Sequence, residues 1–379
     1  MAMRFTSDRK TLLSAVMPAL AASSNKSTLP ALEGLLFELK GNELTVCGYD
    51  LEKGVKTYST VLGEGDGAVI LNAQKISAII RNFPDCDISF EANEKNTVTI
   101  SAGMSEFSVH ALSAEAFPNL PELSGDKSFR INAGLLKEII NSTYFAVAQT
   151  DARPILTGEY FEIKGDKLTV VTLDNHRLAL REETSAIAAG SNAEMKFIVP
   201  GKSIYEFSKL LTDGEETVVV EFTGKHIIMK VGSVIFFSRL LEGEFLDYRK
   251  AIPSQNSIFV KIDRELFIDS VERASLLIDD KLITPLKCTF TGGNLNISCS
   301  TRYGKVNDNI PVYKDGDDIE IGFNNRYLLD ALRACKDELI LASLSSPLMS
   351  MVITAATEKE GSRYLYLVVP IRLNGYNAG

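Results

Sequence analysis

The side chains that could act in catalysis or bind a metal are scattered along this sequence. The three histidines, His110, His176 and His226, lie far apart and lack the spacing of metal ligands. The five cysteines never form a C-x-x-C pair, so neither a zinc site nor a disulfide framework is expected. We interpret them as small buried apolar residues of a reducing compartment; they are Cys47, Cys86, Cys288, Cys299 and Cys335.

Paired carboxylates and glycine-rich segments give no catalytic signature either. The acidic pairs at 279–280 and 317–318 lie beside charged or glycine residues, which is typical of solvated turns rather than of an acid/base dyad. The glycine cluster at 63–67 lacks the G-x-G-x-x-G spacing, and the sequence contains neither a P-loop nor a G-x-S-x-G motif. The sequence therefore offers no catalytic constellation, and we expect neither a cofactor nor a metal.

Composition is that of a globular protein. The chain has 379 residues, of which 45% are hydrophobic and 23% charged, and this excludes a disordered chain, a collagen-like repeat and a coiled coil. Its net charge of −9 gives no global basic field for nucleic acid. No apolar run is long enough to span a membrane, and the N-terminus lacks the apolar core of a signal peptide. We expect a cytoplasmic protein without membrane contact.

One pattern occurs three times along the chain. Each copy opens with a short strand that leads into an amphipathic helix, and Asp8, Asn132 and Asp263 stand where the helix N-cap belongs. A β-hairpin follows each helix, with apolar and polar residues alternating on both arms. The turn glycines of these hairpins are 124 and 127 residues apart, close to a third of the chain, and are Gly41, Gly165 and Gly292.

Each copy then continues with a second strand and a second helix. The strands at 69–71, 197–199 and 319–321 precede apolar residues at i, i+3, i+4 and i+7 spacing, and strand-rich sequence closes each copy. We therefore predict an α+β fold of three similar domains, each with two helices packed on antiparallel sheets. The boundaries are expected in polar or proline-containing connectors, which gives domains 1–124, 125–253 and 254–379.

The predicted helices are more basic than the rest of the chain. They carry 12 basic and 8 acidic residues, about +4, which leaves about −13 for the remainder. This difference has two interpretations: a mildly basic surface that faces a polyanion, or the ordinary solvated faces of surface helices. The acidic helix expected over 263–277 counts against a uniform basic lining.

Several short strings carry a family resemblance. In chain order they are TLPAL at 28–32, FPNL at 117–120, TLDNHRLA at 172–179, FLDYR at 245–249, IGFN at 321–324 and VPIRL at 369–373. Their order and the threefold repeat resemble the bacterial sliding clamp family, the beta subunit of DNA polymerase III. The resemblance extends from residue 3 to residue 373.

This resemblance implies a processivity factor rather than an enzyme. Two chains would close head to tail into a ring of six domains, with helices lining the hole and sheets outside. The ring would encircle duplex DNA, slide along it and tether the polymerase III alpha subunit, the clamp loader and other proteins that carry a clamp-binding motif. Sliding is compatible with phosphate contacts and incompatible with base reading. An external loader is implied because the sequence has no ATP-hydrolysing motif.

The resemblance also nominates DNA contacts. After Arg153 come Pro154 and Ile155, where some relatives place aromatic residues, so contacts from this loop do not follow from the family pattern. Lys26 has a second interpretation as an ordinary solvated loop lysine. The positions that carry over are Lys26, Arg81, Gln149, Arg153 and Lys202.

The family's partner site is a hydrophobic groove between the second and third domains. Leu246 stands where proline is common and Val369 where methionine is common. Without the resemblance, Leu156, Leu178 and Val369 would be interpreted as core residues and His176 as a packed turn residue. The tail at 374–379 is either a cover for this groove or a disordered end. Matching positions are Leu156, Leu173, His176, Arg177, Leu178, Leu246, Asn324, Tyr327, Val369, Pro370, Ile371 and Arg372.

Dimer contacts are expected between the first domain of one chain and the third domain of the next. Glu106 lies on the first side where relatives often have basic residues, so we predict ion pairs of reversed sign with Arg302 and Lys305. Apolar contacts should dominate the affinity, because exposed ion pairs contribute only about 0–1 kcal/mol. The nominated residues are Lys75, Ile79, Glu106, Phe107 and Val109 on one side and Leu276, Leu277, Arg302 and Lys305 on the other.

Two other classes of function stay open at this point. One is a repeat-built adaptor that binds peptides without encircling DNA, and the other is an enzyme whose site uses no known motif. Closure of two chains into a ring separates the clamp from the adaptor.

Overall fold

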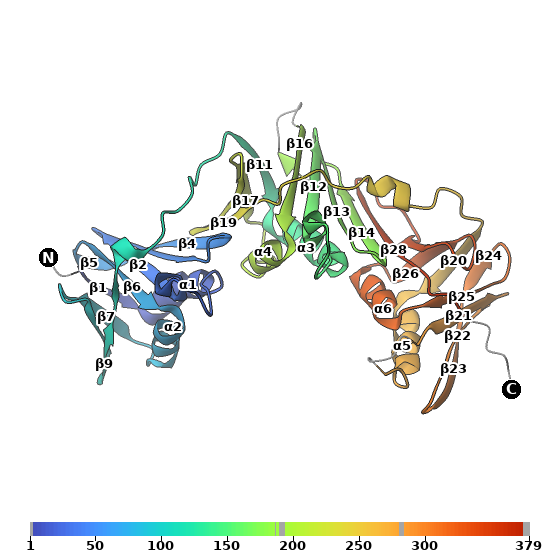
Figure 1. Ribbon diagram of the computed structural model, residues 1–379, viewed down its shortest axis with the longest axis horizontal. Helices are drawn as coiled ribbons and strands as arrows, with labels where there is room; N and C mark the ends of the chain where they lie inside the picture. Colours follow the sequence, from blue (N-terminus) through green and yellow to red (C-terminus); the bar gives the residue numbers. More distant parts are fainter. Residues whose placement is uncertain (1–2, 186, 189–193, 280–283, 374–379) are drawn as a thin grey trace. The chain divides into compact units, whose positions relative to one another are not determined.

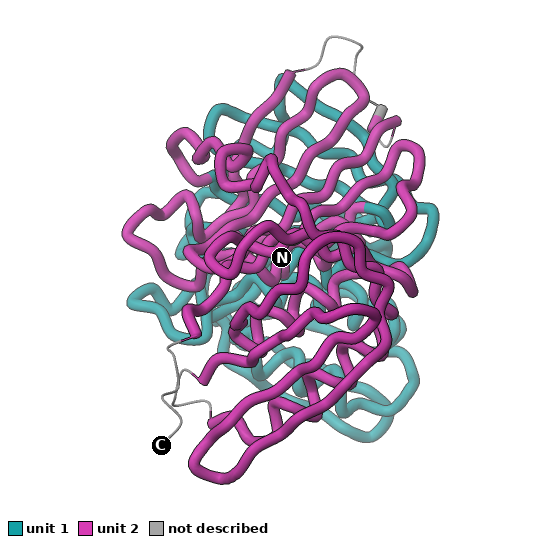
Figure 2. Tube along the Cα trace, turned by 90° about the vertical axis from the view of Figure 1, so that its right-hand side faces the viewer, with its two compact units in different colours: residues 1–135, 206–240 teal, residues 136–205, 241–379 magenta. Residues whose placement is uncertain are grey.

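The computed structural model describes residues 3–185, 187–188, 194–279 and 284–373. Contacts divide the chain into two compact units, shown in teal and magenta in Figure 2. Unit 1 comprises residues 1–135 and 206–240, and unit 2 comprises residues 136–205 and 241–379. The division therefore passes through the second copy of the repeat.

Unit 1 contains two antiparallel sheets. Their strands are β1 (Met3–Asp8), β2 (Gly34–Lys40), β3 (Glu43–Tyr49), β4 (Lys53–Thr60), β5 (Leu62–Gly65), β6 (Gly67–Asn72), β7 (Asp87–Ala92), β8 (Thr97–Ala102), β9 (Ser105–His110), β10 (Leu112–Ser113), β11 (Lys127–Asn132), β17 (Thr217–Phe222), β18 (His226–Val231) and β19 (Val234–Arg239). One sheet has the order β5-β1-β7-β8-β9, and the other runs β10-β6-β2-β3-β4-β19-β18-β17-β11 within this unit.

Unit 2 also contains two sheets. The strands that lie in it are β12 (Gly158–Lys164), β13 (Lys167–Leu173), β14 (Arg177–Glu183), β15 (Ile187–Ala188), β16 (Glu194–Pro200), β20 (Ile258–Asp263), β21 (Leu286–Thr291), β22 (Asn294–Thr301), β23 (Gly304–Pro311), β24 (Tyr313–Asp315), β25 (Ile319–Phe323), β26 (Leu339–Leu344), β27 (Met351–Ala355) and β28 (Ser362–Val368). One sheet has the order β16-β12-β13-β14-β28-β27-β26-β20-β24 and the other the order β23-β22-β21-β25.

The described residues form six α-helices, two in each third of the chain (Figure 1). They begin where the sequence predicts, because the Asp8 and Asp263 carboxylates accept the N–H groups of Thr11 and Leu266, each at 2.9 Å. Asn132 caps the third helix in the same way. The helices are α1 (Arg9–Leu20), α2 (Ala73–Asn82), α3 (Ala133–Thr143), α4 (Gly201–Ser208), α5 (Arg264–Ser275) and α6 (Asn325–Ala334).

The three predicted hairpins are confirmed as β2–β3, β12–β13 and β21–β22. Their turn residues Gly41, Gly165 and Gly292 have φ values of +58°, +63° and +54°. Glycine adopts this left-handed region at little cost, which is why it stands at the same place in each copy. The α+β fold with two helices in each third is therefore confirmed, and the domain boundaries near 124 and 253 stay predictions.

Two strand pairings join successive copies of the repeat. In unit 1, β4 of the first copy pairs with β19 of the second, and Gly54 stands opposite Phe237. In unit 2, β14 of the second copy pairs with β28 of the third, and Leu178 stands opposite Leu367. We call these pairings the first junction and the second junction. Each makes one sheet from strands that lie far apart in the sequence.

The helices bury their apolar faces against the sheets. In unit 1 the rings of Phe5 and Phe90 stack with centroids 4.7 Å apart, beneath the α1–α2 pair. In unit 2, α5 and α6 cover a core that includes Phe267, Phe290 and Phe323, all fully buried. Among the described residues, no helix is both long and apolar enough to cross a membrane.

Candidate functional site

The turn between β13 and β14 anchors the second junction. One carboxylate oxygen of Asp174 accepts the backbone N–H groups of His176 and Arg177 at 2.7 and 3.0 Å. The other oxygen accepts the Arg177 Nε–H at 3.0 Å. This arrangement fixes the turn, so that the His176 side chain is exposed while Arg177 points inward.

Arg177 ties this turn to helix α6. Its guanidinium also pairs with Asp330 on α6 and lies over the ring of Tyr327, 4.6 Å from the centroid. The Phe145 ring lies 5.6 Å away. Because the Arg177 side chain is only 11% exposed and is surrounded by these groups, it positions the site rather than offering a free cation.

Backbone hydrogen bonds bring three further segments to the same place. The N–H of Val369 donates to the His176 carbonyl at 2.8 Å, and the N–H of Ile371 donates to the Gly322 carbonyl at 2.8 Å. Asn324 caps α6 by accepting the N–H groups of residues 326 and 327. The His176 ring then stacks on Tyr327 with centroids 5.3 Å apart. Segments that the sequence nominated separately therefore meet at the second junction.

Two clefts open at this junction. One, of about 370 Å³, is lined by residues 147–151, 174–177, 324, 326 and 327. The other, of about 540 Å³, is lined by residues 320–322, 347–348 and 371–373. We call this pair of clefts, together with the apolar cluster around Leu178, the groove. The first cleft is lined mainly by polar and charged side chains together with Tyr327, and the second has apolar side chains such as Leu348 and Ile371. Polar groups that bind a backbone beside apolar side chains suit extended peptides.

The nominated groove residues have different environments. Leu156 and Leu178 are fully buried, at 0% and 2% exposure, so they lie beneath the surface. Leu173 and Val369 are partly buried and pack on the same cluster as Leu178. The remaining positions are distributed as follows: His176, Arg177, Asn324 and Tyr327 line the first cleft, Ile371 and Arg372 line the second, and Leu246 and Pro370 line neither.

Sequence reasoning missed three contributors to the groove. Phe145 and Asp330 hold Arg177, and Leu348 lines the second cleft while 64% exposed. Phe145 and Asp330 lie in helical segments without a distinguishing motif. Leu348 carried no signal either, because a single leucine in a loop is common at protein surfaces.

The nominated DNA contacts lie in both units. In unit 1, Lys26 is exposed in the loop after α1, and Arg81 is exposed on α2. In unit 2, Lys202 is exposed on α4. Arg153 differs, because Asp151 accepts hydrogen bonds from its backbone N–H and its Nε–H. These bonds hold the pKa of Asp151 below its ordinary value and occupy part of the Arg153 guanidinium.

The nominated dimer residues lie on and beside two sheet edges. Strand β9 is an edge of its sheet in unit 1, and Phe107 on it is 43% exposed. Strand β23 is an edge of its sheet in unit 2. Leu276, the residue that follows α5, is 83% exposed, and α5 packs against β23. Glu106 and Lys305 are exposed on these edges, whereas Arg302 already pairs with Asp279 at 3.1 Å. Of the remaining nominees, Lys75 is exposed, and Ile79, Val109 and Leu277 are partly buried.

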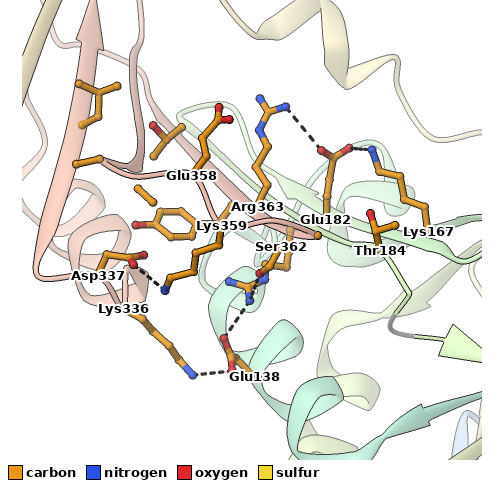
Figure 3. A pocket seen from close by; sticks show the side chains of 17 residues that line it. Glu138, Lys167, Glu182, Thr184, Lys336, Asp337, Glu358, Lys359, Ser362 and Arg363 are labelled. Atoms are coloured by element: carbon orange, nitrogen blue, oxygen red, sulfur yellow. Dashed lines mark hydrogen bonds and ion pairs between the residues drawn. The ribbon is translucent and has the colours of Figure 1, made fainter.

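Outside the groove, a cleft of about 650 Å³ is lined by charged residues (Figure 3). Glu138 lies between Lys336, at 2.8 Å, and Arg181, at 3.1 Å. Lys359 pairs with Asp337 at 2.7 Å. Most of its charged side chains are paired with one another, so this cleft is stabilised by its own ion pairs.

The buried cysteines have unreactive thiols. Burial raises the pKa of Cys47, Cys288 and Cys335 to about 12, so these thiols stay protonated. Cys299 is also buried, and burial raises its pKa. The interpretation as small buried apolar residues is confirmed for these four, whereas Cys86 is only half-buried. Within the described ranges, no group of histidine, cysteine and carboxylate side chains is arranged to hold a metal ion.

Comparisons with known proteins give one consistent result. The DNA polymerase III beta subunit models match in chain order, the N-terminal domain at residues 3–121, the central domain at 130–247 and the C-terminal domain at 249–372. The beta sliding clamp of Staphylococcus aureus is 30% identical over 98% of this chain and 99% of its own length. The match therefore extends over nearly the whole of both proteins.

Comparison with solved structures points to the same family. The DNA polymerase sliding clamp from Bacillus subtilis has a TM-score of 0.94 and 28% identity, and the alignment covers 99% of this chain and 100% of that one. A sliding clamp from Pseudomonas aeruginosa bound to griselimycin has a TM-score of 0.92 and 29% identity, with 98% and 100% coverage. The threefold repeat thus has an explanation: this chain belongs to the beta sliding clamp family, the DNA polymerase III beta subunits, which are non-catalytic processivity factors.

Proposed function

We propose that two copies of this chain close head to tail into a ring that encircles duplex DNA and slides along it without reading its sequence. The observation that carries this proposal is the placement of two sheet edges, β9 in the first third of the chain and β23 in the last. An edge strand offers unpaired N–H and C=O groups to another chain. Two different edges make a heterologous contact, which closes into a ring when the rotation allows.

Side chains on the two edge strands, and Leu276 directly after α5, support this pairing. Phe107 and Leu276 expose apolar surface, which a partner would remove from water. Glu106 on β9 and Lys305 on β23 are exposed and opposite in charge. The ion pair between them would fix the register of the two strands, and the apolar contacts would supply most of the affinity.

Sliding requires contacts that hold the DNA backbone without fixing a position on it. Lys26, Arg81 and Lys202 are exposed lysine and arginine side chains that suit water-mediated phosphate contacts. The chain as a whole is acidic, with a net charge of −9, which disfavours DNA binding elsewhere on its surface. We propose that these three residues are the principal DNA contacts and that Gln149 and Arg153 contribute from their loop.

The groove is the proposed partner site. Short extended segments of the polymerase III alpha subunit, the clamp loader and other binding partners would place an apolar anchor over Leu173 and Val369, with His176 and Asn324 orienting the backbone. Griselimycin, which is bound in the Pseudomonas aeruginosa structure, is proposed to bind this chain in the groove. The protein would act in the cytoplasm as three domains, 1–124, 125–253 and 254–379.

Retention on circular DNA tests the ring. Loaded by a clamp loader onto a nicked circular plasmid, the protein should remain bound through gel filtration and should be released when the plasmid is cut once. Sedimentation equilibrium should give twice the 41.5 kDa chain mass. A monomer at every concentration, or equal retention on cut and uncut DNA, would contradict the ring and favour an adaptor that binds peptides alone.

A further inference from the structure

The two junctions are built alike. In the turn after β3, Asp50 accepts the backbone N–H groups of Glu52 and Lys53 at 3.0 and 2.8 Å, as Asp174 does for the corresponding groups in the turn after β13. Asp50 also pairs with the Lys53 ammonium at 2.7 Å. The two turns are separated by the same 124 residues as the first two hairpin glycines.

The surrounding segments correspond as well. Short 3-10 helices begin at Pro30 and Pro154, again 124 residues apart. The Arg239 N–H donates to the carbonyl of residue 52 at 2.8 Å, as the Val369 N–H donates to that of residue 176 at 2.8 Å. The first junction therefore has the backbone framework of the groove.

The side chains beneath the two frameworks differ. Where the second junction has Leu178, the first has Gly54, and a Cβ at Gly54 would lie only 2.1 Å from Cζ of Phe237. The Phe237 ring therefore lies directly over Gly54, and it is fully buried. Tyr49 stands where the second junction has Leu173, and its ring is 5.5 Å from that of Phe237.

The residues that pack over the two junctions from the connectors and at the rim also differ. Phe117, from the connector after the first copy, is only 9% exposed and packs in the same cluster as Tyr49 and Phe237. Its counterpart Phe245 is only partly buried. At the rim, exposed Arg239 replaces the apolar Val369. Aromatic rings pack at both junctions, since Tyr160 and Phe245 belong to the cluster around Leu178. The first junction differs in that the Phe237 ring lies directly over Gly54, where the second has Leu367 opposite Leu178. The two clefts described above open beside the second junction.

We infer that the first junction is a second copy of the partner groove that the chain fills with its own Tyr49 and Phe237. Without those side chains, the first junction would bind the same class of ligand as the second, the apolar anchor of a short extended peptide. The inference uses the proposed role of the second junction to name that ligand. Gly54, Phe237 and Tyr49 then prevent peptide binding at the first junction, so each chain binds one partner at a time and partners compete for a single groove.

A graft tests the inference. The substitutions Tyr49→Leu, Gly54→Leu, Phe237→Leu and Arg239→Val install the side chains found at Leu173, Leu178, Leu367 and Val369. Calorimetric titration with griselimycin should give one equivalent per chain for the wild type and two for the graft. Phe236→Leu is the matched control, because the Phe236 ring faces Phe207 instead, at 5.2 Å, and this variant should stay at one. Two equivalents on the wild type, or one on a folded graft, would overturn the inference.

A second measurement tests the inference if the fourfold variant does not fold. Phe237→Ala should leave an apolar space at the junction, and such spaces bind benzene. Benzene should then raise the unfolding midpoint of Phe237→Ala and leave that of the wild type unchanged. Absence of this rise would also overturn the inference. A wild-type chain that binds no griselimycin would contradict the proposed groove, and the benzene measurement would still decide whether Phe237 fills the first junction.

Discussion

Arg177 and Asp330 form an ion pair that joins the β13–β14 turn to helix α6. The turn supplies the groove with His176, and the helix supplies it with Tyr327. This pair therefore acts with the contacts of Arg177 and His176 on the Tyr327 ring to hold the two walls of the first cleft together. The Arg177 guanidinium has its second partner in Asp174, so removing Asp330 changes the position of the arginine without leaving it unpaired.

We expect Asp330→Asn to weaken griselimycin binding about tenfold, because the wall carried by α6 loses a charge-assisted hydrogen bond of roughly 1.5–3 kcal/mol. Calorimetry should show the change in affinity with unchanged stoichiometry. Asp269→Asn on α5 is the matched control and should bind as the wild type does. Wild-type affinity in Asp330→Asn would show that the pair does not position the groove.

Charge reversal tests the pairing of β9 with β23. Glu106→Lys should raise the dimer dissociation constant up to about fivefold, which corresponds to about 1 kcal/mol for an exposed pair. The double variant Glu106→Lys, Lys305→Glu should restore it. Sedimentation equilibrium at low salt measures both effects. If Glu106→Lys dimerises as the wild type does, the ion pair is absent from the interface.

Replacement of Lys202 tests the DNA surface. Lys202→Ala should weaken binding to duplexes of every sequence to the same degree, and the slope of log K against log salt should fall by about one unit, since one phosphate contact is lost. Lys209→Ala is the control, because Lys209 already pairs with Glu206 at 2.9 Å. Equal behaviour of the two variants would remove Lys202 from the contact surface.

Glu159 gives a prediction on pH. Burial raises the pKa of this carboxyl well above its ordinary value, opposed by a hydrogen bond from Thr143, and its second oxygen has no hydrogen-bond partner. The folded state therefore binds the proton more tightly than the unfolded state. Stability from this group is present at pH values below the ordinary carboxyl pKa and is lost as pH rises toward the folded value.

Glu159→Gln should accordingly lose less stability than the wild type as the pH rises above about 5, as measured by urea denaturation. Glu162→Gln is the contrasting variant. Burial raises the pKa of Glu162, but hydrogen bonds from Arg249 and Lys164 lower it overall, so this group favours folding at higher pH. Parallel stability curves for Glu159→Gln and the wild type would show that Glu159 does not titrate in this way.

Local features of the fold were predictable, because the residues that cause them are adjacent in the sequence. Asp8 and Asp263 cap their helices, and Gly41 and Gly165 adopt the left-handed turn conformation. The 124-residue spacing of Asp50 and Asp174 was also readable and indicates the two matching turns.

Contacts between segments that lie far apart in the sequence were harder to predict from it. Nothing near Arg177 in the sequence indicates Asp330, 153 residues away. The pairing of Gly54 with Phe237 depends on strand register, which a hydrophobic pattern restricts but does not assign to a particular partner strand. For this reason the groove residues were nominated from the family resemblance, whereas the Phe237 ring over Gly54 became visible only in three dimensions.

The first junction also affects how this chain is made. Strand β4 is complete at Thr60, but its neighbour β19 begins only at Val234. At a synthesis rate of roughly 5–20 residues per second, β4 waits roughly 10–35 s on the ribosome for that neighbour. During this interval its unpaired backbone groups and Gly54 are open to other chains. Nascent chains that stop before Val234 therefore expose this strand edge to strand-mediated aggregation, and chaperone protection matters over that stretch of synthesis.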